Sequence, residues 1–156
     1  MKIVRSLAKI TKKTVKTLEA HPVAKTMFKG TMTKKAYIHY LIQTVKYVAY
    51  SPPFLQAAAC GAMAKYPDLA AIFQVKSAEE TDHDNLALED LEKLGIDKPS
   101  VIETPACAAV DEYIQYHVRE IAEGVPAAFF GACWVLETLA IACGPKALKG
   151  LRNNPN

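Results

Sequence analysis

The sequence predicts an all-α protein, and three observations support this fold class. Apolar residues recur at helical spacing, no alternating segment is long enough for a strand, and glycines and prolines fall between the helical segments. A chain of 156 residues, 51% hydrophobic and 22% charged, is long enough for one domain with a sizeable core. Since no repeat or domain boundary is evident, we expect one helical domain over residues 1–156.

The bounds of the expected helices follow from residues that start or stop helices. Proline disfavours helix at the residue before it, glycine ends helices, and threonine caps helix starts. These signals predict a helix over residues 3–19, a short helix that ends at Lys29 before Gly30, and a long helix that begins at Thr31-Met32-Thr33 and is broken at Ser51-Pro52-Pro53. Further helices are expected over about 54–65, from Asp68 to Leu94 before Gly95, and over about 106–123 and 126–143, with a final turn or two over Pro145–Leu151. The longest loop is expected from Ile96 to Pro105.

The charge pattern argues against nucleic-acid and membrane partners. The net charge of +3 is mild, and the N-terminal lysines alternate with apolar residues at helical spacing, which is typical of a solvated helix face. The N-terminus lacks the apolar core of a signal peptide, and the longest apolar run, Val125 to Gly144, is interrupted by Glu137 and Thr138. We therefore expect a cytoplasmic protein.

The four cysteines show no zinc-like spacing. Cys60, Cys107, Cys133 and Cys143 are expected to act as small buried hydrophobic residues, which is their usual role in a cytosolic chain.

A carboxylate and an imidazole stand three residues apart in the helix predicted from Asp68 to Leu94: Glu80 and His83. At this spacing both side chains leave the same helical face and can bind one metal ion. His117 with Glu120 has the same spacing in a later helix and is a second, weaker candidate pair.

A second acid lies in the helix predicted over 126–143. This helix is apolar all round except at Glu137 and Thr138, which is the pattern of a helix at the centre of a bundle. A buried carboxylate needs a metal, a cationic partner or a bound proton, whereas an exposed Glu137 at a helix margin would need none. A buried acid together with a Glu-x-x-His helix favours a carboxylate-bound iron site.

The segment from Glu79 through Thr81-Asp82-His83-Asp84-Asn85 to Gly95 resembles the signature helix of the haem-oxygenase-like diiron oxidases, also called iron-containing redox enzymes. Gly30-Thr31-Met32-Thr33 with Tyr37 to Gln43 is similar to a helix start shared by the wider TenA, PqqC and haem oxygenase superfamily. Trp134 to Ala140 resembles the second ligand helix of the oxidases. The resemblance implies a haem-oxygenase-like helical bundle.

The resemblance also implies a site. Glu80, His83 and Glu137 would be ligands of non-haem iron, with one or two irons bound, and Glu79 is the substitute for Glu80 if the helix phase differs. Asp90 would orient the His83 ring, or else be an ordinary exposed acid. The implied function is O₂ activation on a small apolar or amino-acid-like substrate.

The chain departs from the oxidase pattern near its end. These enzymes take their remaining ligands from a later His-x-x-x-Asp-x-x-His helix, and the sequence to Asn156 contains no such motif. We therefore expect a C-terminally shortened bundle, through truncation or because the product is naturally short. A bundle lacking one helix would leave an apolar groove, which predicts a homodimer, with exchanged helices as one form.

Two alternatives come from other functional classes. The first is a non-catalytic binding or interaction module built on the same scaffold. The second is a TenA-like aminopyrimidine hydrolase, in which Cys133 matches the nucleophile, although Thr44 stands where such enzymes have an aspartate. Haem binding is disfavoured because no histidine precedes His21.

Overall fold

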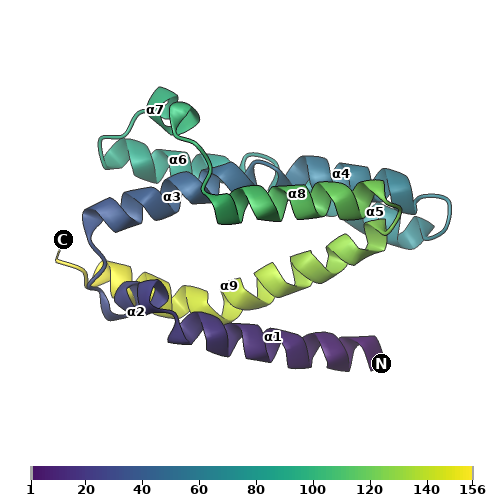
Figure 1. Ribbon diagram of the computed structural model, residues 1–156, viewed down its shortest axis with the longest axis horizontal. Coiled ribbons are helices and arrows are strands. Elements are labelled where there is room, and N and C mark those ends of the chain that lie inside the picture. Colours follow the sequence, from purple (N-terminus) through teal and green to yellow (C-terminus); the bar gives the residue numbers. More distant parts are fainter. Residues whose placement is uncertain (1, 156) are drawn as a thin grey trace. The chain divides into compact units, whose positions relative to one another are not determined.

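The computed structural model describes residues 2–155, and the side chains of residues 4–155, and every regular element in that range is helical (Figure 1). The predicted all-α fold class is confirmed. The elements are α1 (Lys2–Ala20), α2 (Pro22–Lys29), α3 (Lys34–Val48), α4 (Ser51–Ala62), α5 (Pro67–Glu80), α6 (His83–Lys93), α7 (Lys98–Glu103), α8 (Ala108–Ala122), the short 3₁₀ helix η1 (Pro126–Ala128) and α9 (Phe129–Arg152).

The chain divides into two compact units. The terminal unit comprises Met1–Ala36 and Phe130–Asn156, and the central unit comprises Tyr37–Phe129. The terminal unit thus holds α1, α2 and nearly all of α9, while the central unit holds most of α3 and all of α4 to α8.

In the terminal unit, α2 and α9 approach backbone to backbone at two glycines. Gly30 ends α2 in the left-handed conformation, with φ 66° and ψ 36°, as the sequence predicts. A Cβ atom at Gly30 would lie 2.6 Å from the carbonyl oxygen of Gly150, and one at Gly150 would lie 2.9 Å from the carbonyl carbon of Phe28. Only glycine fits both positions, so these two residues set the closeness of the contact.

Two further contacts join the segments of the terminal unit. The Lys146 ammonium of α9 pairs with the Glu19 carboxylate of α1. The Asn154 side chain donates a 2.7 Å hydrogen bond to the carbonyl oxygen of Met32. Cys143 is buried, and this burial, with the nearby Glu19 carboxylate, raises the pKa of its thiol. The thiol is therefore kept protonated, in line with the packing role expected for it.

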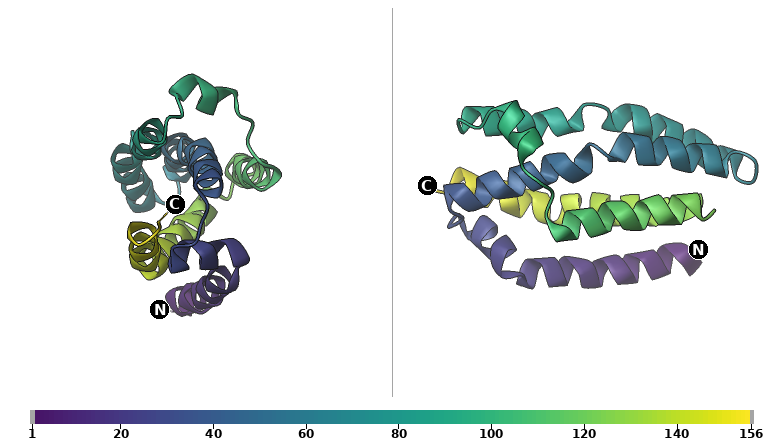
Figure 2. Two further views of the ribbon diagram at one scale, coloured as in Figure 1. Left: turned by 90° about the vertical axis from the view of Figure 1, so that its left-hand side faces the viewer. Right: turned by 45° about the horizontal axis from the view of Figure 1, so that its top comes forward.

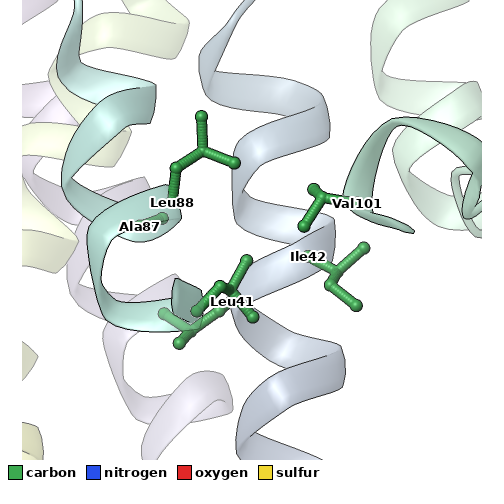
Figure 3. Close-up of a cluster of buried hydrophobic side chains, with 6 residues drawn as sticks. Leu41, Ile42, Ala87, Leu88 and Val101 are labelled. Atoms are coloured by element: carbon green, nitrogen blue, oxygen red, sulfur yellow. The ribbon is translucent and has the colours of Figure 1, made fainter. Parts of the chain in front are cut away.

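The central unit has an apolar core where α3, α6 and α7 meet (Figure 3). Its members are fully or nearly fully buried: Leu41, Ile42, Ala87, Leu88, Leu91 and Val101. α7 is tied to α3 by polar contacts as well, because the Lys46 ammonium donates a 3.0 Å hydrogen bond to the carbonyl oxygen of Ile102. Burying these side chains supplies most of the driving force for packing the three helices.

The buried amide of Gln43 fixes the chain between α7 and α8. Its Oε1 atom accepts a 2.7 Å hydrogen bond from the backbone N–H of Cys107, and its Nε2 atom donates one of 3.3 Å to the carbonyl oxygen of Pro105. A buried amide with both ends satisfied holds this loop against α3.

Helices α4 and α5 pack side by side through small residues (Figure 2). Ala58, Ala62 and Ala70 have no exposed surface. An aromatic cluster adjoins this contact, in which Phe129 packs against both Phe54 and Phe73, with ring centroids 5.7 and 6.5 Å apart.

Several helix bounds differ from the prediction. One is the start of α4, which begins at Ser51 although Ser51-Pro52-Pro53 was expected to be a break. The helix expected from Asp68 to Leu94 is broken at Thr81 and Asp82 into α5 and α6. The loop expected from Ile96 to Pro105 contains α7, which begins because the Asp97 carboxylate accepts a 3.1 Å hydrogen bond from the backbone N–H of Ser100. The end of α9 was expected as a separate turn, but the helix continues through Pro145.

Residues 126–143 have the apolar pattern of a helix at the centre of a bundle, but the structure does not bury them on all sides. Several apolar side chains of α9 are exposed, including Phe130, Leu136, Ile141 and Leu148. Within the described residues, Pro126–Arg152 is the one helical stretch long and apolar enough to cross a membrane by length and composition, which is a weak indication, because core helices of soluble proteins meet the same criteria. The absence of a membrane partner stays a prediction.

Candidate metal centre

The Glu80-x-x-His83 pair lies at a joint between two helices and not inside one. Glu80 is the last residue of α5, and His83 is the first of α6. Between them, Thr81 is extended and Asp82 is left-handed, with φ 66° and ψ 7°. Aspartate adopts this conformation more readily than most residues other than glycine. The joint therefore sets how the two side chains face each other.

The two side chains nevertheless meet. His83 Nδ1 lies 3.0 Å from Glu80 Oε2, and the two side chains are 49% and 23% exposed. In the tautomer with a proton on Nδ1, the ring donates a hydrogen bond to the carboxylate. Of the two adjacent acids, Glu80 is therefore the one shown against the imidazole.

This geometry fits a metal ion bound by both groups. Two ligand atoms at about 2.1 Å from an ion and at right angles to each other are about 3 Å apart, which is the separation of His83 Nδ1 and Glu80 Oε2. Carboxylate oxygen and imidazole nitrogen are also the donor types that suit iron. The pair alone supplies two donors, so a complete site needs others.

Sequence reasoning missed a lysine beside this pair. Lys76 Nζ lies 3.2 Å from Glu79 Oε2 and 3.9 Å from Glu80 Oε1. The signal was available, because a lysine three and four residues before two glutamates lies on their helical face. Glu79, named as the substitute ligand, is thus paired with Lys76 and is 56% exposed.

Two further residues of the predicted site are Asp90 and Glu137. Asp90 pairs with Lys93 at 3.1 Å, so its role in orienting the His83 ring stays a prediction. Glu137 belongs to α9 in the terminal unit and is exposed, contrary to the buried position expected for it. Within residues 2–155, no group of three or more His, Cys, Asp or Glu side chains has the arrangement of a metal site. The three-ligand site therefore stays a prediction.

His117, considered as a second ligand with Glu120, lies in an aromatic environment. Its ring is 6% exposed and contacts rings from α4, α8 and the start of α9, namely Phe54, Tyr113, Tyr116 and Phe129, at centroid distances of 4.5 to 5.8 Å. Burial lowers the pKa of His117, which favours the neutral imidazole. The ring packs as a member of the aromatic cluster.

The residues relevant to the hydrolase alternative are divided between the units. Cys133 lies in α9 of the terminal unit and is partly buried, whereas Thr44 lies in α3 of the central unit. The Thr44 hydroxyl donates a 2.9 Å hydrogen bond to the carbonyl oxygen of Tyr40 in its own helix. A hydroxyl used in this way is a poor replacement for a carboxylate that orients a substrate.

Comparison with known proteins identifies the wider family. Neither a search of curated proteins nor one of solved structures gave a match. The family model described as TENA/THI-4/PQQC matches residues 5–154, which span both units and nearly the whole chain. This protein therefore belongs to the TENA/THI-4/PQQC family.

Proposed function

We propose that this chain is a non-haem iron oxidase or oxygenase of the TENA/THI-4/PQQC family, acting on a small apolar or amino-acid-like substrate. The observation that carries the proposal is the 3.0 Å approach of His83 Nδ1 and Glu80 Oε2. Membership of the family supports an enzyme on this scaffold. The resemblance of the segment around His83 to the diiron oxidases supports iron in particular.

In this proposal His83 supplies a neutral nitrogen donor, and Glu80 supplies a carboxylate whose negative charge offsets part of the ion's charge. Glu137 is the third proposed ligand. Bound iron would supply the means to activate O₂. The partial exposure of Glu80 and His83 leaves the ion accessible to solvent and to small molecules.

Iron analysis of protein loaded anaerobically with Fe(II) tests the proposal. We expect His83→Ala to lose most of the iron held by the unsubstituted protein, because the imidazole is one of few donors. His39→Ala is the matched control, since His39 is also an exposed helical histidine of the central unit. Equal iron in the unsubstituted protein and in His83→Ala would contradict the proposal.

The second candidate function is aminopyrimidine hydrolysis with Cys133 as the nucleophile, favoured by the family match itself. Assay of aminopyrimidine substrates with the unsubstituted protein and Cys133→Ser separates the two candidates. Hydrolysis that is lost in Cys133→Ser and unchanged in His83→Ala would favour the hydrolase.

We also propose that the working form is a homodimer. The support is the exposed apolar surface of α9, where Ile141 is 76% exposed and Leu148 is 50% exposed. Light scattering measures the mass in solution, and Ile141→Glu is expected to shift a dimer toward monomer. A monomer at all concentrations would contradict the dimer. If the protein is folded but holds no iron and shows no hydrolysis, the non-catalytic binding module is favoured over both enzyme functions.

A further inference from the structure

We infer that Lys76 is a built-in competitor for the metal at the Glu80–His83 pair and therefore sets how tightly a divalent cation is held there. This inference rests on the proposed function, because it concerns the same two ligands. The juxtaposition that carries it lies entirely on α5 and the first residue of α6.

The two oxygens of Glu80 face different neighbours. Oε2 lies 3.0 Å from His83 Nδ1, and Oε1 lies 3.9 Å from Lys76 Nζ. A divalent ion held by His83 and Oε2 would therefore share one carboxylate with an ammonium group. Like charges about 5 Å apart repel even near a protein surface, so Lys76 opposes binding of the ion.

Glu79 provides a second position for the ammonium. Lys76 Nζ lies closer to Glu79 Oε2, at 3.2 Å, than to Glu80. Glu79 is the more exposed of the two acids, so an ammonium held there is better screened from the ion by solvent. Binding of a cation is then coupled to movement of Lys76 from between the two acids toward Glu79.

Two consequences follow for affinity. Removing the ammonium while keeping an unbranched side chain of similar length should tighten cation binding. Removing the carboxylate of Glu79 should weaken it, because Lys76 then loses the acid that draws its ammonium away from Glu80. The second effect depends on Lys76, so it should shrink when Lys76 has been replaced.

Calorimetric titration with Co²⁺ tests the inference without relying on activity. We expect Lys76→Met to bind Co²⁺ about tenfold more tightly than the unsubstituted protein at low ionic strength, with the difference shrinking as salt is added. Lys93→Met is the matched control, because Lys93, like Lys76, pairs with an acid three residues away on its own helix. We expect it to change the affinity less than twofold.

Two more variants separate this inference from the proposed function. The double variant Lys76→Met/His83→Ala should no longer show the tighter binding of Co²⁺. Glu79→Gln should weaken Co²⁺ binding more when Lys76 is present than when it has been replaced by Met. If His83→Ala loses Co²⁺ but Lys76→Met binds as the unsubstituted protein does, the inference is overturned and the metal site stands. If Co²⁺ binds none of the proteins, or binds regardless of His83, both are overturned. Circular dichroism checks that each variant is folded.

Discussion

The two units of this protein are stabilised by different kinds of contact. The central unit buries aliphatic side chains where α3, α6 and α7 meet, and it adds an aromatic cluster between α4, α5 and α8. The terminal unit relies on the close approach of Gly30 and Gly150 and on the Lys146–Glu19 pair, while apolar residues of α9 remain exposed. The candidate ligands Glu80 and His83 belong to the unit with the better-buried core.

The packed core of the central unit can hold ligand side chains more rigidly than the terminal unit can. A carboxylate and an imidazole must be held within fractions of an ångström to bind one ion, and a packed core gives that precision. A unit with few buried contacts and exposed apolar side chains is better suited to association. We therefore expect the central unit to hold Glu80 and His83 in place and the terminal unit to take part in association.

The largest expected effect is that of a core truncation in the central unit. Leu91 has no exposed surface, so Leu91→Ala removes buried methyl groups and leaves a cavity, at a cost of about 3 kcal/mol in the free energy of unfolding. Urea unfolding measures this loss. Hydrogen exchange resolved by segment then shows its extent, and faster exchange confined to the central unit would show that the two units are stabilised independently.

The next effect is expected from Gly150→Ala in the terminal unit. The added Cβ would meet the backbone of Phe28, which cannot move aside as a side chain would, so we expect a loss of about 2 kcal/mol. Gly144→Ala is the control on the same helix, since a Cβ there meets nothing within 4 Å. A Gly150→Ala protein as stable as the control would show that the glycine contact does not hold the terminal unit together.

A smaller effect is expected from pH, through His117 in the central unit. Because burial lowers its pKa in the folded protein, the unfolded chain binds the proton more readily. Its contribution to stability is therefore complete above the unfolded pKa of about 6.5 and is lost as pH falls toward the folded value. Urea unfolding at pH 7.5 and 5.5 should show a smaller loss in His117→Phe than in the unsubstituted protein. The exposed His39 replaced by Gln is the control, and an equal loss in all three would refute the assignment.

The smallest effect is expected from Lys146→Met in the terminal unit. The Glu19 carboxylate raises the pKa of Lys146, but the pair lies at the surface, where salt weakens it. We expect a slight fall in the melting temperature that disappears at high salt. A large fall that persists in salt would mean that this pair contributes more to the terminal unit than its exposure suggests.

Much of the fold was predictable, because local signals determine where helices end. Gly30 and Gly95 both have positive φ, of 66° and 87°, and end the helices that the sequence assigned to them. The break at Thr81 and Asp82 was not predictable, because neither residue is glycine or proline. The burial of α9 was misjudged for a different reason: an apolar pattern indicates that a helix favours being covered, but not what covers it.

The candidate site was predictable in part. The i, i+3 spacing predicted that Glu80 and His83 lie close together, as they do. The choice between Glu79 and Glu80 depends on helix phase, which the joint at Asp82 alters. The proposed role of Lys76 was not predictable from sequence, because it depends on the distance between its ammonium and the Glu80 carboxylate. The position of Glu137 in the sequence could not indicate its exposure.

The left-handed backbone at Asp82 has a consequence for evolution and engineering. A non-glycine residue in this conformation costs roughly 1–2 kcal/mol, which the surrounding helices must offset. Asp82→Gly would relieve that cost and also give the joint more freedom. A stabilising substitution is therefore available between the two candidate ligands. A gain in thermal stability there would come with looser control of the angle at which carboxylate and imidazole meet.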